Sequence, residues 1–132
     1  MTIQVKRAYD PPAPDDGRRV LVDRLWPRGL SKERAAVDEW LRAVAPSTAL
    51  RRWFAHDPAR WAEFKRRYSA ELEAPAAREA VARLRSLAAG GHITLLYAAR
   101  DQEHNNAVAL CEYLASSRQP GPRPDRDRPG AG

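Results

Sequence analysis

Two clusters of charged and aromatic residues carry the chemistry that this sequence offers, and each follows a short apolar run. Residues 24–29 follow the run at 20–22, and residues 100–105 follow the run at 93–99. Guanidinium groups bind carboxylates and phosphates through paired hydrogen bonds. We therefore predict a site for a small ligand that bears a phosphate or a carboxylate, with the ligand-binding residues Arg24, Trp26, Arg28, Gly29, Arg100 and Asn105.

Acid–base chemistry has one histidine candidate in these clusters, His104. The ordinary pKa of a histidine is about 6.5, which suits proton transfer near neutral pH, and Asp101 or Asp23 can orient the imidazole or act as the base. Each residue also has a structural interpretation. His104 can be a capping or surface residue of a helix, and Asp23 can be a partly buried charge paired with an arginine. The predicted catalytic residues are His104, Asp101 and Asp23.

The sequence lacks the motifs of the common enzyme classes, namely a Gly-rich phosphate loop, a Gly-x-Ser-x-Gly elbow and a zinc signature. Cys111 is the single cysteine, so a Cys-rich metal site is excluded, and we predict no metal site and assign no cofactor. The formal net charge of +6 keeps nucleic-acid binding open, although 17 acidic residues are interspersed among the 23 basic ones. Three classes remain: an enzyme acting on a small anionic or nucleotide-like ligand, a nucleic-acid-associated protein, and a ligand-sensing or interaction module.

Apolar patterning predicts three strands that position these clusters. Alternation over residues 2–8 indicates a half-exposed strand near the sheet edge, and the runs at 19–26 and 92–99 indicate strands buried on both faces. Pro27 cannot donate to a sheet, so the second strand must end near Trp26. The helical segments between the two buried strands permit a parallel crossover. We therefore expect these strands to be parallel neighbours, with both clusters at their carboxyl ends.

Helix signals occupy the segments between and after the strands. Apolar residues at helical spacing predict a helix from the cap at Ser31 to the break at Pro46. A second helix begins at Pro75 and ends at Gly90. These elements predict an α/β fold, a small, mainly parallel β-sheet with helices packed on its faces in a single domain. The predicted N-cap residues are Ser31, Ser47, Asp57 and Asp101.

Length and composition set the domain organisation. Residues 1–118 fit one α/β domain, whereas the Pro/Arg/Gly-rich residues 119–132 have no large apolar side chain and are predicted to be a disordered tail. No apolar run approaches the roughly 20 residues that cross a bilayer, and the amino terminus has no signal-peptide core, so no membrane partner is expected. With a single cysteine, we expect a cytoplasmic protein, and its oligomeric state is left open.

Three segments carry a resemblance to a known family: KRAYD, VDRLWPRG and TLLYAARDQEHN, with an Asp-Gly pair before the second. They resemble the YeaO-like branch of the bacterial family called domain of unknown function 488, over about residues 3–116. The resemblance implies a small cytoplasmic α/β domain without an assigned activity. The family usually has Lys at the position of Arg100. Its pattern covers Lys6, Arg7, Tyr9, Asp16, Gly17, Arg19, Asp23, Arg24, Trp26, Pro27, Arg28, Gly29, Trp40, Asp101 and Asn105.

Overall fold

Four parallel strands form one sheet in the computed structural model, which describes residues 2–116. The strand order is β1-β4-β2-β3, and every neighbouring pair is parallel. The predicted α/β fold with a small parallel sheet is therefore confirmed. The tail predicted at 119–132 lies outside the described residues. The strands are β1 (Thr2–Arg7), β2 (Arg18–Leu21), β3 (Glu39–Trp40) and β4 (His92–Tyr97).

The two predicted buried strands, β2 and β4, are neighbours at the centre of the sheet. Their register pairs Val20 with Leu95 and Leu21 with Leu96, and these four side chains are fully buried. Strand β1 lies at the edge beyond β4 and is half-buried, as its alternating pattern predicted. Because the central strands run in the same direction, the loops that follow them leave from the same edge of the sheet, as expected.

Strand β2 ends earlier than predicted, at Leu21 instead of near Trp26. The N–H of Val22 still donates to the carbonyl of Leu96, at 3.2 Å. The next donor, the N–H of Ala98 directly after β4, binds the carboxylate of Asp23 at 2.9 Å. A side chain has replaced the main chain as acceptor, so the ladder ends and residues 22–31 form a loop.

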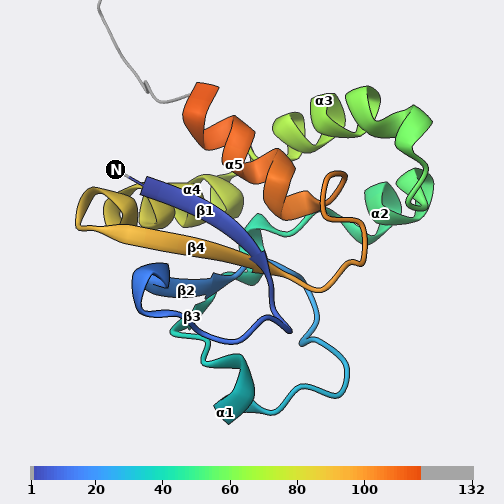
Figure 1. The fold of residues 1–132 in the computed structure, drawn as a ribbon. Helices are drawn as coiled ribbons and strands as arrows, with labels where there is room; N and C mark the ends of the chain where they lie inside the picture. Colours follow the sequence, from blue (N-terminus) through green and yellow to red (C-terminus); the bar gives the residue numbers. More distant parts are fainter. Residues whose placement is uncertain (1, 117–132) are drawn as a thin grey trace, which may run out of the picture.

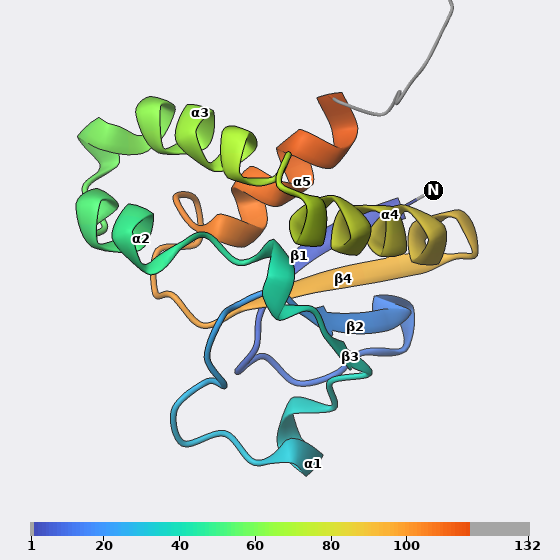
Figure 2. The same cartoon turned by 180° about the vertical axis from the view of Figure 1, so that it is seen from behind.

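Within residues 2–116, five helices flank the sheet. Figures 1 and 2 show α2, α3, α4 and α5 on one side of it and α1 near the other. The N-caps predicted at Ser31 and Ser47 are confirmed, since each hydroxyl accepts an N–H from the first turn of its helix. Asp57 caps a short 3-10 turn that leads into α3, and Pro75 is the first residue of α4. The helices are α1 (Lys32–Ala35), α2 (Thr48–Phe54), α3 (Trp61–Glu71), α4 (Pro75–Ala89) and α5 (Asn106–Ser116).

The prediction of a helix that continues to Pro46 is wrong beyond the first turn. Helix α1 ends at Ala35, and the chain then forms the short strand β3, which pairs with β2 at the sheet edge, and a 3-10 turn. The apolar residues that suggested a helix belong to two different cores. Val37 and Trp40 pack on one side of the sheet, and Leu41 and Val44 pack on the other. Their spacing therefore reflects a chain that wraps around an edge.

Two apolar cores lie on opposite faces of the sheet. The larger one lies between the sheet and helices α2 to α5, and it includes an apolar stripe along α3, with Phe64, Tyr68 and Leu72 almost fully buried. The smaller one joins Leu21 and Leu96 to α1 and the loop before it.

None of the helices within residues 2–116 is long and apolar enough to cross a membrane.

Candidate functional site

The loops at the carboxyl ends of β1, β2 and β4 form one edge of the molecule, which we call the carboxyl edge. It comprises residues 8–10, 22–31 and 98–105, and Figure 1 shows the last two loops leaving the sheet on the same side. All nine predicted site residues lie on this edge. The structure divides them into residues that hold the loops in place and residues that face solvent.

Asp23 ties the two central loops together. One carboxylate oxygen accepts the N–H of Ala98, and the other accepts the side-chain amide of Asn106 at 3.0 Å. The same amide also donates to the carbonyl of Val22. Burial raises the pKa of Asp23 above its ordinary value, although these hydrogen bonds and the charge of Arg51 act in the opposite direction. Asp23 therefore binds the side-chain amide of Asn106 in place of the predicted arginine. The sequence did not identify Asn106 as its partner.

We expect Asp23→Ala to lower the free energy of unfolding by about 1–3 kcal/mol, because the Ala98 N–H and the Asn106 amide lose their acceptors. Removing a charge that is costly to bury offsets part of this loss. Urea denaturation of the variant measures the effect. Asp15→Ala, which removes an exposed carboxylate, is the matched control and is expected to change little. Equal midpoints for the two variants would show that the hydrogen bonds of Asp23 contribute nothing to stability.

Asp101 and His104 are in contact, as the predicted acid–base pair requires. The distance from Asp101 Oδ2 to His104 Nδ1 is 3.0 Å, which leaves Nε2 of the ring for another partner. Asp101 Oδ1 accepts the backbone N–H groups of Glu103 and His104, and these bonds lower the pKa of Asp101. The imidazole also packs against Trp61 in a T-shaped arrangement, with ring centroids 5.3 Å apart. The pair therefore has a structural role as a cap of the loop, whatever chemistry it also performs.

Helix α5 does not begin where the sequence predicted. Asp101 caps a turn inside the loop, and the helix starts at Asn106, five residues later. The N-cap is Asn105, whose side-chain oxygen accepts the N–H of Val108 at 2.9 Å and whose amide donates to the carbonyl of Asp101. Asn105 is 3% exposed. Its side-chain oxygen and amide are hydrogen-bonded within the chain, so Asn105 supports the loop from inside.

Three of the predicted ligand-binding residues have other roles in the loop 22–31. The indole N–H of Trp26 donates to the carbonyl of Leu30 at 2.6 Å, and its ring packs edge-on against Trp40. Arg24 is exposed, and one of its nitrogens donates to the carbonyl of Pro46 at 3.3 Å. Gly29 has a φ of 75°, which suits the turn that reverses the loop.

Arg7 and Tyr9 connect the two loops from the end of β1. The guanidinium of Arg7 donates to the carbonyls of Ala98 and Ala99 at 3.0 Å each, and it stacks on the ring of Tyr9 at 4.9 Å. The hydroxyl of Tyr9 in turn donates to the carbonyl of Arg28 at 2.8 Å. The sequence offered these two residues only through the family pattern, because nothing in their local spacing indicates that they bridge distant loops.

Arg28 and Arg100 are the two predicted arginines that face solvent with no partner. Both are exposed, and no hydrogen bond or ion pair engages either guanidinium among residues 2–116. Arg28 accepts the bond from Tyr9 through its carbonyl, and Arg100 follows the carbonyls that Arg7 binds. The Arg7–Tyr9 bridge therefore links the backbones that carry these two free guanidinium groups.

Three further residues of the family pattern form an ion cluster that is largely buried. Asp16 and Arg19 pair at 2.6 Å with almost no exposed surface, and Lys6 reaches the same carboxylate at 3.0 Å. Burial alone would raise the pKa of Asp16, but hydrogen bonds from the Ala13 N–H, Lys6 and Arg19 lower it below its ordinary value. Arg19 also donates to the carbonyl of Ala35, so the cluster lies on the face of the sheet that carries α1.

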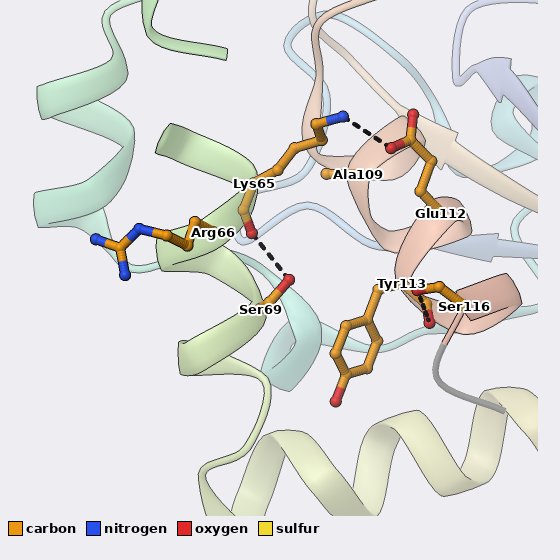
Figure 3. A pocket seen from close by; sticks show the side chains of 7 residues that line it. All are labelled: Lys65, Arg66, Ser69, Ala109, Glu112, Tyr113 and Ser116. Carbon is orange, nitrogen blue, oxygen red and sulfur yellow. Dashed lines mark hydrogen bonds and ion pairs between the residues drawn. The ribbon is translucent and has the colours of Figure 1, made fainter. Parts of the chain in front are cut away.

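Two surface hollows lie away from the carboxyl edge. Figure 3 shows one of them between α3 and α5, where Lys65 points across it to Glu112 and pairs at 3.0 Å. The other lies at the amino edge of the sheet, beside Arg18 and His92. Within residues 2–116, no group of three or more His, Cys, Asp or Glu side chains is placed to hold a metal ion.

The fold defines a small α/β protein with exposed arginines at its carboxyl edge and no metal cluster within residues 2–116. A family model described as the inactive DUF488-N3 subclade matches residues 2–125, so the chain belongs to the DUF488 family, in agreement with the predicted resemblance. It is 45% identical to the uncharacterised protein YeaO of Escherichia coli (strain K12), over 88% of this chain and 99% of YeaO. It is 42% identical to the uncharacterised proteins Rv3073c of Mycobacterium tuberculosis (strain H37Rv) and Mb3100c of Mycobacterium bovis, over 85% of this chain and 92% of each relative. No solved structure matched the chain.

Proposed function

We propose that this protein is a non-enzymatic binding protein that holds a carboxylate or a phosphate at its carboxyl edge. The observation that supports this function is the pair of exposed guanidinium groups of Arg28 and Arg100, which have no partner within residues 2–116. Guanidinium groups bind these anions with paired, charge-assisted hydrogen bonds. Because the Arg7–Tyr9 bridge ties their loops together, the binding surface is organised before the anion arrives.

We place the anion on exposed side chains, because donors of the loops 22–31 and 98–105 are already engaged within the chain. The carboxylate of Asp23 already occupies the Ala98 N–H and the Asn106 amide, and Asp101 occupies two N–H groups of its loop. The protein's own acids thus fill positions that a parallel sheet usually offers to a ligand. The exposed guanidinium groups remain as donors for an external anion, which favours a ligand held at the surface of this edge.

Two observations favour binding without chemistry. The matching family model is described as an inactive subclade. In addition, both carboxylate oxygens of Asp23 accept hydrogen bonds within the chain, so this residue is not poised to accept a proton from a ligand.

The contact between Asp101 and His104 favours a second candidate, general acid–base catalysis on the bound anion. A carboxylate on Nδ1 fixes the tautomer of an imidazole and leaves Nε2 to exchange a proton. We rank this candidate lower because the same carboxylate caps two N–H groups and the ring packs on Trp61, which already accounts for the pair.

Isothermal titration with citrate and with pyrophosphate tests the proposed function. We expect the wild-type protein to bind at least one of these small anions, and we expect Arg28→Ala and Arg100→Ala each to weaken binding by roughly tenfold or more, since each removes a charge-assisted contact. Thermal melts should shift little, because both side chains are exposed and unpaired within residues 2–116. His104→Ala is expected to bind as the wild type does.

The matched control is Arg18→Ala, which removes an exposed arginine from the amino end of β2 at the opposite edge of the sheet. It should bind both anions as the wild type does. Binding that survives both edge substitutions, or no binding by the wild type, contradicts the proposal. A single-stranded oligonucleotide serves as the third titrant, because binding to it that weakens steeply with salt would assign the arginines to nucleic acid.

A further inference from the structure

The carboxyl edge also carries exposed apolar surface. Within residues 2–116, the two large hydrophobic side chains that are exposed are Leu25, at 68%, and Tyr9, at 37%. Both lie on this edge, and the Tyr9 hydroxyl bonds to the carbonyl of Arg28, three residues after Leu25. Single exposed hydrophobic residues are common on protein surfaces. Here, however, the exposed apolar groups coincide with unpartnered guanidinium groups, which is the composition of a protein-binding surface.

Leu25 is exposed on a loop that is fixed in place. Asp23, two residues before it, accepts hydrogen bonds from Ala98 and Asn106, and Trp26, directly after it, packs on Trp40 and bonds to Leu30. The indole N–H of Trp40 holds the carbonyl of Asp23 at 2.7 Å, which fastens the start of the same loop. The loop therefore presents Leu25 in a set orientation, so that little conformational entropy is lost when a partner covers it.

The exposed groups of this edge fit a polypeptide better than a nucleic acid. Bases stack on free aromatic faces, but one face of Tyr9 is covered by the guanidinium of Arg7, and Trp26 is packed against Trp40. The most exposed apolar side chain is the aliphatic Leu25, which fits a pocket between side chains and offers no ring for stacking. A small inorganic or sugar phosphate would likewise leave Leu25 uncovered. An acidic polypeptide supplies both the carboxylates and the apolar cover.

We infer that residues 23–29 form a docking surface for an acidic polypeptide, whose carboxylates pair with Arg28 and Arg100 and whose apolar side chains cover Leu25. This inference rests on the proposed function, because it names the molecule that carries the bound anion. Charge complementarity sets the orientation of the partner through the two arginines, and burial of Leu25 adds affinity that a free carboxylate lacks.

A displayed library of random short peptides tests the inference. The library is selected on the full-length chain after depletion on the double variant Leu25→Ser/Arg28→Ala. We expect the enriched peptides to combine Asp or Glu with large apolar residues. In fluorescence anisotropy, an enriched peptide should bind Leu25→Ser and Arg28→Ala each about tenfold or more weakly than wild type, and Arg18→Ala equally well. Leu25 and Arg28 are exposed, so both variants should keep the circular dichroism and melting temperature of wild type.

The other outcomes separate this inference from the proposed function. Binding of citrate or pyrophosphate that requires Arg28 would support the anion site. If, in the same experiments, the enriched peptides bind Leu25→Ser as tightly as wild type, the polypeptide partner is excluded. Failure to enrich any acidic peptide would overturn the inference as well. If gel filtration shows a wild-type dimer that Leu25→Ser converts to a monomer, the occupant is a second copy of this chain and the acidic partner is excluded.

Discussion

Replacing Arg19 with alanine is expected to lower the free energy of unfolding by about 3–5 kcal/mol, the usual cost of breaking a buried ion pair from one side. Arg19 is 3% exposed and pairs with Asp16, which is 1% exposed. Its remaining nitrogens donate to the carbonyls of Ala35 and Asp10, so the same side chain fastens α1 and the loop after β1 to the sheet. The substitution leaves a buried carboxylate with only Lys6 as a charged partner and frees two carbonyls.

Urea denaturation of Arg19→Ala and of three further variants tests this expectation. Arg66→Ala breaks an exposed pair with Glu63 and should hardly change the midpoint, because surface ion pairs contribute little. Asp16→Ala should be destabilising, and the double variant Asp16→Ala/Arg19→Ala should lose less than the sum of the two single losses, because the removed groups are coupled. Additive losses would mean that Arg19 acts through its carbonyl contacts and not through the pair.

The sequence was sufficient to predict the parallel pairing of β2 with β4. Both are short, continuous apolar runs bounded by turn residues, a pattern that is typical of strands covered on both faces in parallel sheets. Their residues Val20, Leu21, Leu95 and Leu96 are indeed fully buried. The caps at Ser31 and Ser47 were equally accessible, because a cap is a local interaction between a side chain and an N–H two or three residues ahead.

Strand β3 could not be recognised because its two residues gain their structure from a distant partner. Trp40 pairs beside Leu21, and its indole N–H donates to the carbonyl of Asp23. Two residues are too few to display an alternating pattern, whereas the apolar residues around them match helical spacing by coincidence. The long-range contacts outweighed the local preference, as tertiary structure commonly does.

The candidate site was predicted in composition but not in the orientation of its side chains. Clusters after buried strands correctly located residues 22–31 and 98–105 at one edge. The pattern could not indicate that Trp26 and Asn105 turn inward, since this depends on Trp40 and on where α5 begins. It also gave no sign that Asn106 would close on Asp23 from more than eighty residues away. Exposed arginines such as Arg28 are recognisable only after these internal partners have been assigned.

Gly17→Ala is expected to destabilise the protein by about 3–6 kcal/mol, from a backbone conformation that alanine resists and from a collision within the sheet. Gly17 has a φ of 63° and a ψ of −137°, which glycine adopts without strain and residues with a Cβ rarely do. A Cβ built on Gly17 would lie 2.1 Å from the carbonyl oxygen of His92 and 2.6 Å from its carbon. These are backbone atoms, so no side-chain rotation can relieve the contact.

The surroundings leave neither partner free to withdraw. His92 is the first residue of β4 and pairs with Thr2 of β1, so moving it would pull the strand from its neighbour. On the other side, Asp16 is held by Arg19, and its carbonyl accepts the hydroxyl of Thr94 at 2.7 Å. Alanine at position 17 must therefore separate the loop from β4 or distort the start of the central strand, and both disturb the buried ion cluster.

Two other glycines separate the causes of this loss. Gly29→Ala introduces a Cβ with no atom within 4 Å but at a φ of 75°, so it should cost only the backbone strain, about 1–2 kcal/mol. Gly90→Ala has a φ of −86° and no neighbour closer than 3.6 Å, and it should be nearly neutral. The urea midpoint should be highest for Gly90→Ala, lower for Gly29→Ala and lowest for Gly17→Ala. A Gly17→Ala variant as stable as Gly29→Ala would mean that the loop moves freely away from β4, and that the ion cluster does not hold it there.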